Sequence, residues 1–280
     1  MIYMLQFSHS SMLRYEACPY SLLLYASRIR VGERHSGTWD GPMSIFAFVG
    51  TVLHNAIEHA LNNRTHDHVP INQIHPTALA LFDEGVRERN FIEEQDEGRE
   101  GQEVPFRELI SEQRARISKL CLEFSRIWRD RGFASMEIIT FEELWAIRWN
   151  ERVELRGSID LLLQDSNGIY HIIDWKSGAL PNSPLQLQLY SVLLQRRLSV
   201  PFDSIMKMNV SLSEGSGYPS PGKQRDEKAV RRRIDRLMSN LLAMEDVETS
   251  SGPLISYAAP SDTNCPYCHE RERCGFSWVG

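Results

Sequence analysis

Hydrophobic residues recur at helical spacing over the first part of this chain. To about Arg30 the apolar positions follow a near-helical period, and a second apolar stripe predicts a helix over residues 44–62. That stripe consists of Phe46, Val49, Leu53, Ile57 and Leu61. Further helices are predicted at about 76–92 and 105–131, on either side of an acidic stretch (93–103) that is typical of a solvated loop.

The period then changes from helical to alternating. Residues 137–149, 153–164 and 169–176 are separated by short turns and predict three successive strands. A helix at about 184–198 and a fourth strand at about 204–212 are predicted to follow. The order of helix, three-strand meander, helix and strand indicates an α/β fold.

Composition narrows the class of protein. The 280 residues are 42% hydrophobic, which is enough for a full core. No apolar stretch approaches the ~20 residues that cross a bilayer, and the N-terminus lacks the basic segment of a signal peptide. We therefore expect a cytoplasmic protein without a membrane partner. The net charge of −6 argues against a general nucleic-acid coat protein, but it allows an enzyme with one local binding patch.

Chemically active side chains gather on two of the predicted strands. Asp160 lies on the polar face of the second strand, and Asp174 and Lys176 share one face of the third. Two carboxylates and an ammonium in one cleft suit Mg²⁺ or Mn²⁺ and the orientation of a water, which is phosphodiester-hydrolysis chemistry. Each motif alone also fits an ordinary polar strand end. Their order, their 14-residue separation and their matching faces favour a site.

These residues resemble the motifs of a known superfamily. GSID with Asp160, DWKSG with Asp174 and Lys176, and the following QLQLY are similar to the PD-(D/E)XK nucleases, especially the RecB-like exonucleases. The resemblance extends from Ser10 to Cys274 and implies a restriction-endonuclease-like core with added N-terminal helices and a C-terminal tail. Asp174 stands where many members carry glutamate, but aspartate is common in the RecB-like branch.

The resemblance also implies roles for individual residues. It implies metal ligation by His54, Asp160, Asp174 and the main-chain carbonyl of Trp175. Lys176 would act on the attacking water, and Gln186 and Tyr190, four residues apart on one helix, would line the cleft. Residues 1–280 would form one domain with four parts: N-terminal helices (1–64), a helical insertion (65–135), the catalytic core (136–212), and a helix with a cysteine-bearing tail (213–280).

Four of the five cysteines lie at opposite ends of the chain: Cys18, Cys265, Cys268 and Cys274. Thiolates are soft ligands that select iron–sulfur clusters or zinc. One early cysteine and a terminal C-x2-C-x5-C resemble the part of the superfamily that carries a [4Fe–4S] cluster. That part includes the AddB-type helicase–nucleases and the CRISPR-associated exonucleases. Structural zinc is the alternative, and the fifth cysteine, Cys121, is expected to be buried packing.

Several other residues are weaker candidates. Glu142 and Glu143 could add a carboxylate to the cleft, although charge on an outer strand is ordinary. His59 is expected to be structural, and Glu58 could support His54. Residues 223–236 hold seven Lys or Arg among three acidic residues, which fits either a phosphate-tracking surface or a solvated helix face.

The expected function is metal-dependent DNA hydrolysis, with exonuclease action on single-stranded or frayed ends. The pathways left open are repair, recombination and CRISPR-type DNA processing. Because the chain has no phosphate-binding G-x-x-x-x-G-K-[ST] loop, any helicase or integrase partner would be a separate polypeptide. The alternative is a non-catalytic DNA-end-binding or scaffold subunit of a helicase–nuclease or integration complex.

Overall fold

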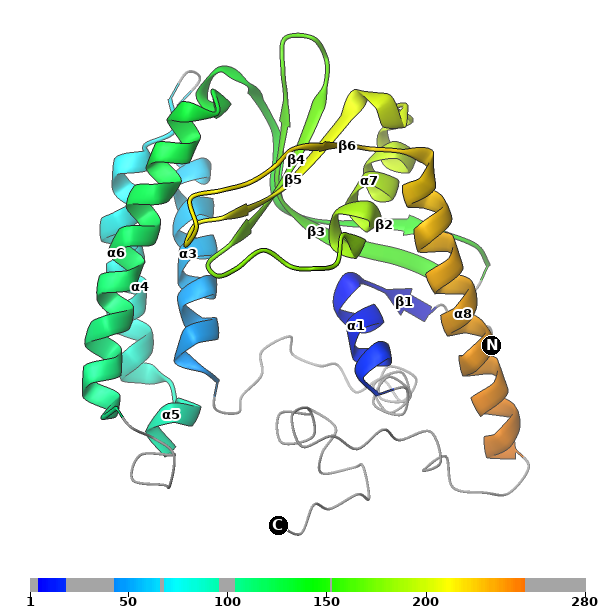
Figure 1. Cartoon of the computed structure of the whole chain (residues 1–280), viewed down its shortest axis with the longest axis horizontal. Helices are drawn as coiled ribbons and strands as arrows, with labels where there is room; N and C mark the ends of the chain where they lie inside the picture. Colours follow the sequence, from blue (N-terminus) through cyan, green and yellow to red (C-terminus); the bar gives the residue numbers. More distant parts are fainter. Residues whose placement is uncertain (1–4, 19–42, 66–67, 96–103, 152, 250–280) are drawn as a thin grey trace.

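A mixed β-sheet lies between two groups of helices in the computed structural model of the chain (Figure 1). The structure describes residues 5–18, 43–65, 68–95, 104–151 and 153–249. The strands are β1 (Leu5–Phe7), β2 (Glu137–Arg148), β3 (Val153–Gln164), β4 (Tyr170–Lys176), β5 (Ile205–Ser211) and β6 (Ser220–Pro221). The main helices are α1 (His9–Ala17), α3 (Ile45–Asn62), α4 (Ile74–Glu88), α5 (Ile92–Gln95), α6 (Phe106–Asp130), α7 (Leu185–Leu198) and α8 (Gln224–Thr249).

Strand β3 is the centre of the sheet because three strands pair with it. Strand β2 runs antiparallel to it along one edge. On the other edge, β1 pairs in parallel with Val153–Leu155 and β4 pairs antiparallel with Leu161–Gln164. β4 then pairs in parallel with β5. The stretch of β3 between β1 and β4 therefore has no strand partner on that edge within the described part of the chain, and Asp160 lies in this stretch.

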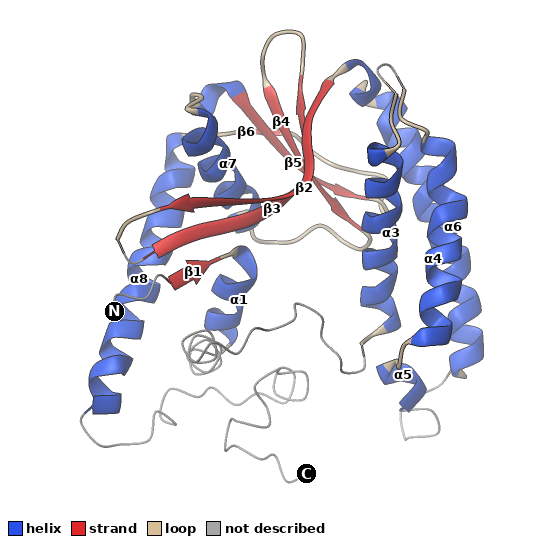
Figure 2. Ribbon diagram, turned by 180° about the vertical axis from the view of Figure 1, so that it is seen from behind, coloured by secondary structure: helices blue, strands red, loops and turns tan. Residues whose placement is uncertain are grey.

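Each face of the sheet is covered by its own hydrophobic cluster. Helices α3, α4 and α6 pack on one face against side chains such as Leu161, Ile173 and Trp175. Helices α7 and α8 pack on the other face, against side chains such as Leu155 and Ile172. Figure 2 shows the two helical groups on either side of the sheet. Side chains from the two faces of the strands thus pack into two separate cores, which is why the strands carry apolar residues on both faces.

Helix α3 is anchored at its first turn by a residue from a distant segment. Ser44 caps the helix, with its Oγ accepting from the Phe46 N–H at 3.3 Å. Glu93 accepts from Ser44 Oγ at 2.6 Å and from the Ile45 N–H at 3.0 Å. This carboxylate also sits at the positive end of the helix dipole. The start of α3 is therefore fixed by its cap and by the segment after α4.

The α/β class and the predicted order of α3, the β2–β4 meander, α7 and β5 are confirmed. The predicted bounds of these six core elements agree with the structure to within one residue at each end. Two short strands, β1 and β6, were not predicted, and β6 lies in a segment expected to be loop. The predicted first helix is described only as far as Cys18. Within the described residues, no helix has the length and apolar character that a membrane crossing requires.

Candidate active site

The two motif aspartates lie where β3 and β4 separate. Their pairing ends at Leu161–Ile173, one residue before Asp160 and Asp174 would face each other. Beyond that point a side-chain bond takes the place of main-chain pairing: Asp160 Oδ2 accepts a hydrogen bond from the main-chain N–H of Trp175 at 2.8 Å. Asp160 is 8% exposed and Asp174 is fully buried. The divergence of two strands therefore creates a buried site with two carboxyl groups.

Helix α3 and strand β2 bring two further ligand-type groups to Asp160. His54 Nδ1 lies 2.9 Å from Glu142 Oε1 and 3.7 Å from Asp160 Oδ2. The ligand atoms of His54, Glu142 and Asp160 all lie within 4.8 Å of one another. This spacing is compatible with one shared cation.

Glu142 owes its position to an unusual backbone conformation. Its φ is 47°, in the left-handed region that non-glycine residues rarely adopt. The β2–β3 register places Glu142 opposite Asp160, between the pairs Phe141–Leu161 and Glu143–Ile159. Such conformations cost of order 1–3 kcal/mol and cluster at functional sites. The strain at Glu142 supports a functional reason for its place in the site.

Burial and the crowding of charge perturb the pKa values of His54, Asp160 and Asp174. Burial, and then the charge of Asp174, raise the pKa of Asp160 to about 7. Burial also raises the pKa of Asp174, against the opposing charge of Lys176. Burial by itself lowers the pKa of His54, but its hydrogen bond with Glu142 and the nearby carboxylates outweigh burial and raise that pKa to about 9. The carboxylates repel one another here, and a bound cation would relieve that repulsion.

Lys176 is held by a chain of polar contacts that begins at Asp174. Its Nζ lies 2.5 Å from Asp174 Oδ2 and donates to Gln186 Oε1 at 3.0 Å. Asp174 Oδ2 is held in this ion pair, whereas its Oδ1 is buried and has no hydrogen-bond partner among the described residues. Gln186 Nε2 in turn donates to the hydroxyl of Tyr190 at 3.0 Å. A buried carboxyl oxygen without a partner requires an explanation, and a bound cation or a catalytic role would supply one.

The loop after Lys176 is tied down from two directions. The carbonyl of Lys176 accepts from the Leu212 N–H at 2.8 Å, and the carbonyl of Gly178 accepts from Ser211 Oγ at 2.8 Å. From α6, Arg116 donates to the carbonyl of Ser177 at 3.0 Å. Sequence reasoning missed Arg116, because it lies in the segment treated as an insertion and no local motif marks it.

The structure also separates residues that sequence alone left together. Glu143 accepts from Thr140 at 2.7 Å and from Arg197 at 3.2 Å, outside the ligand group. His59 is exposed on α3. Cys121 is buried, and burial raises the pKa of its thiol to about 12, in keeping with packing. Cys18 is half-buried just after α1, while Cys265, Cys268 and Cys274 lie outside the described residues.

A family model now decides the assignment. The model of the PD-(D/E)XK nuclease superfamily matches residues 6–275, nearly the whole chain. The chain belongs to the PD-(D/E)XK nuclease superfamily. Members of this superfamily are typically metal-dependent nucleases that act on DNA.

Two other comparisons add little to the superfamily assignment. No curated protein sequence matches the chain. Among solved structures, the one described as "Crystal structure of SSO0001" is 16% identical, over 81% of this chain and 96% of its own, with a TM-score of 0.32. At this TM-score the likeness carries no argument.

The donor set of this PD-(D/E)XK chain fits a hard divalent cation. Carboxylate oxygens with one imidazole suit Mg²⁺ and Mn²⁺, whereas thiolates would be expected for a softer metal. His54, Glu142 and Asp160 supply the close group, and Asp174 supplies an unpartnered buried oxygen next to it. Divalent metal binding is therefore chemically plausible at this place.

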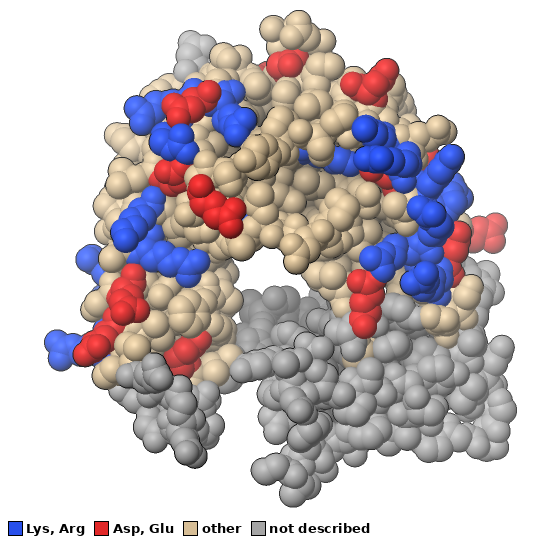
Figure 3. All heavy atoms as spheres, in the orientation of Figure 1, with Lys and Arg blue, Asp and Glu red and all other residues tan. Residues whose placement is uncertain are grey.

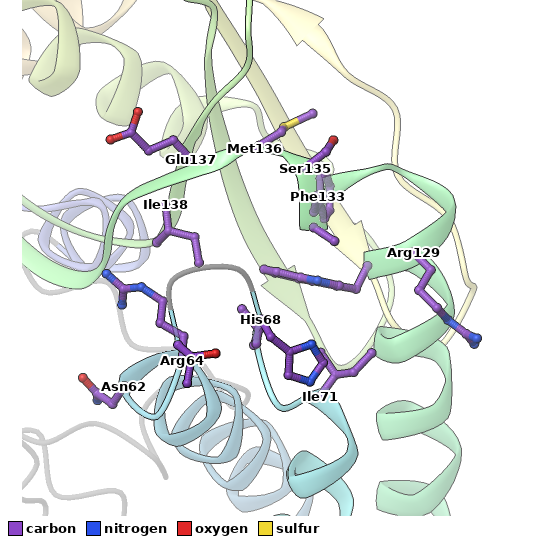
Figure 4. Close-up of a pocket in the computed structure, with 14 residues that line it drawn as sticks. Asn62, Arg64, His68, Ile71, Arg129, Phe133, Ser135, Met136, Glu137 and Ile138 are labelled. Atoms are coloured by element: carbon purple, nitrogen blue, oxygen red, sulfur yellow. The ribbon is translucent and has the colours of Figure 1, made fainter.

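A cavity of about 1260 Å³ lies further along the same two elements (Figure 4). Its lining includes Asn62 at the end of α3, Arg64 just beyond that helix, and Glu137 and Ile138 at the start of β2. None of the proposed site residues lines it. In Figure 4 the Arg64 side chain points toward Ile138, while Glu137 points away. The cavity is separate from the carboxylate site and is not needed for the chemistry below.

Proposed function

We propose that this chain is a Mg²⁺- or Mn²⁺-dependent deoxyribonuclease that removes nucleotides from single-stranded or frayed DNA ends. The observation that carries the proposal is the meeting of His54, Glu142 and Asp160 beside the buried pair of Asp174 and Lys176. A pure binding protein has no chemical use for buried, mutually repelling carboxylates beside an ammonium.

Four side chains would hold the cation. His54, Glu142 and Asp160 form the close group, and the free Oδ1 of Asp174 is the fourth candidate. The main-chain carbonyl of Trp175 remains a proposed ligand. The Trp175 N–H donates to Asp160, so the main chain of Trp175 lies beside a proposed metal ligand. When bound, the cation would neutralise charge on the phosphoryl group and make water more acidic.

Lys176 would position the attacking water. An ammonium has three N–H donors, of which one binds Gln186 and one faces Asp174, so that one is left for a water or a phosphoryl oxygen. Gln186 and Tyr190 would hold the ammonium in place rather than touch the phosphorus. This arrangement preorganises a positive group where negative charge develops in the transition state.

Action on DNA ends is the finer part of the proposal, and it rests on the RecB-like motif set described above. Linear and circular single-stranded DNA of the same sequence test it directly. Degradation of the linear form only, with metal present, is the expected result. Equal cleavage of the circular form would show an endonuclease instead.

We further propose that Cys18, Cys265, Cys268 and Cys274 hold a [4Fe–4S] cluster, with zinc as the competing metal. Support comes from their spacing and from Cys18, which follows α1, a helix in contact with α7 and α8. The cluster would be structural. Iron and acid-labile sulfide in anaerobically purified protein would support it, and zinc without iron would refute it. Because reduced thiolates persist in the cytoplasm, that location remains our prediction.

The biological setting follows from the same resemblance. Repair, recombination and CRISPR-type DNA processing would each use end resection, and a separate helicase or integrase could supply the ends. The alternative, a non-catalytic end-binding or scaffold subunit, predicts that labelled DNA is shifted intact in a gel. A metal-dependent ladder of shorter products would exclude it.

A further inference from the structure

Acidic and basic side chains lie on different sides of helix α8. Its basic segment, residues 223–236, contains three acidic residues, and two of them face the neighbouring elements β5 and α7. Asp226 is 2% exposed, forms an ion pair with Lys207 of β5 and accepts from the Lys223 N–H at 3.0 Å. Glu227 accepts from Arg196 of α7 at 2.9 Å and from Arg231 at 3.2 Å. These carboxylates are committed to holding α8 in place.

The opposite side of α8 is left as a basic stripe, which we define as Arg225, Lys228, Arg232 and Arg236. All four side chains are exposed. At 3.6 residues per turn they lie within an arc of about 80° and extend over about 16 Å. Among the described residues, none of the four has an ion-pair partner. Lys and Arg side chains gather over the α8 side of the molecule in Figure 3.

The stripe does not serve the packing of the helix. Val230, Ile234 and Leu237, all buried, attach α8 to the core from the other side. Like charges three and four residues apart on a helix repel and weaken it. Asp235, the third acidic residue of the segment, is exposed at the edge of this stripe, so the outer side is basic but not purely cationic. In a chain of net charge −6, four aligned cations still form a surface that fits an external anion.

We propose that the basic stripe of α8 binds the phosphate backbone of duplex DNA next to the end that the active site cleaves. The proposal rests on the proposed function and adds to it: the substrate would be a duplex with a frayed end. Helix α7 links the two places, since it carries Gln186 in the site and Arg196 bonded to Glu227 of α8. Ten residues of helix span about 15 Å, which corresponds to roughly four to five stacked base pairs.

The chemistry of the stripe favours a duplex over a single strand. Single-strand binding surfaces interleave aromatic side chains on which bases stack. The stripe has none, and the nearby Trp149 ring is covered by Arg196 at 3.9 Å and Arg231 at 5.0 Å from its centroid. A surface of cations alone recognises regularly spaced phosphates.

The test measures how duplex binding depends on salt. The full chain and a variant with Arg225→Gln, Lys228→Gln, Arg232→Gln and Arg236→Gln are titrated onto a fluorescent duplex of about 20 base pairs, with chelator present, between about 50 and 200 mM salt. The slope of log K against log salt is negative, and each lost phosphate contact reduces its magnitude by about 0.9. With four cations replaced, the slope of the stripe variant should therefore be shallower by about 3 to 4.

Two controls fix the interpretation. Replacing the three stripe arginines by lysine should keep the wild-type slope, because the charge is retained. Changing Arg107 and Lys119, two exposed basic residues of α6, to glutamine should also keep it. An unchanged slope in the stripe variant would overturn the inference, because it would show that these four cations do not contact the phosphates. If the chain binds duplex with the expected slope but never cleaves DNA, the proposed function fails, while duplex binding by the stripe is still supported.

Discussion

Glu142 Oε1 lies 2.9 Å from His54 Nδ1, although the two residues are 88 positions apart in the chain. This contact connects α3 with β2 next to Asp160, whose Oδ2 lies 3.7 Å from the same His54 nitrogen. It makes Glu142 part of the ligand group, where local pattern alone treated it as one of two equivalent glutamates. The pair therefore extends the proposed metal site beyond the residues that the motifs name.

The first prediction concerns Glu142 itself. Glu142→Gln keeps the shape of the side chain but removes one negative oxygen from the ligand group. We expect Mn²⁺ affinity, measured by calorimetry, to fall by about 10- to 100-fold, the range seen when groups that support a metal site are altered. Glu143→Gln is the matched control, since Glu143 contacts Thr140 and Arg197 instead. Equal Mn²⁺ affinity in the wild type and Glu142→Gln would remove Glu142 from the site.

Lys176→Ala should separate metal binding from chemistry. The substitution removes the ammonium but none of the four proposed side-chain ligands, so Mn²⁺ should still bind. Cleavage should fall at least about 100-fold, the cost of losing one preorganised donor at a developing charge. Single-turnover cleavage and Mn²⁺ titration of the same preparation measure both quantities. Undiminished cleavage would rule out the proposed role of Lys176.

Metal binding should release protons near neutral pH. With the pKa of His54 at about 9 and that of Asp160 at about 7, both groups carry protons at lower pH and must lose them to bind a cation. Mn²⁺ affinity should therefore rise with pH through 7 and on towards 9. Calorimetry near neutral pH in two buffers of different ionisation enthalpy should detect about one to two protons released per ion. A heat independent of the buffer would contradict this expectation.

The same groups set the pH dependence of stability without metal. The raised pKa of Asp160 means that the folded state loses stability as pH rises from 3.8 to about 7. The raised pKa of His54 stabilises the fold below pH 6.5, and that contribution is lost as pH rises through about 9. Asp160 and His54 both make the metal-free protein less stable as pH rises, so together they should lower its melting temperature from low to high pH. Mn²⁺ should raise the melting temperature more at pH 9 than at pH 6. A larger metal effect at the lower pH would argue against these assignments.

Gly157 tests the packing behind Tyr190. A Cβ at this position would lie 2.8 Å from Leu193 Cδ1 and 2.8 Å from Tyr190 Cε1. Gly157→Ala should therefore lower the free energy of unfolding by about 1–3 kcal/mol and reduce cleavage through the displaced Tyr190. Gly178→Ala is a suitable control, because its Cβ would meet nothing within 4 Å. Denaturant unfolding of both variants measures the difference, and equal stability would show that the core adapts at Gly157.

Sequence reasoning could find the parts of this site that lie close together in the chain. Asp160, Asp174 and Lys176 sit on successive strands separated by a short turn, so their place near one another could be predicted from the pattern. The position of Glu142 did not, because it depends on a left-handed backbone conformation that no local signal marks. Arg116 is 61 residues from Ser177, so their contact exists only in the tertiary fold. Strand β1 has three residues, too few to show an alternating period.

The basic segment of α8 shows a different kind of limit. Its charges were visible in the sequence, but their use was not. Only the fold shows that Asp226 and Glu227 are bound to Lys207 and Arg196 from other elements. Counting charges along the helix therefore underestimates how basic its outer face is.

The central claim is that this cleft hydrolyses DNA with a divalent cation. The most direct test incubates an end-labelled oligonucleotide with the wild-type chain and with Asp174→Asn, each with Mn²⁺ and with chelator. We predict a product ladder only for the wild type with Mn²⁺, while Asp174→Asn remains folded by circular dichroism. Equal cleavage by folded Asp174→Asn, or cleavage by the wild type that survives chelation, would contradict the account.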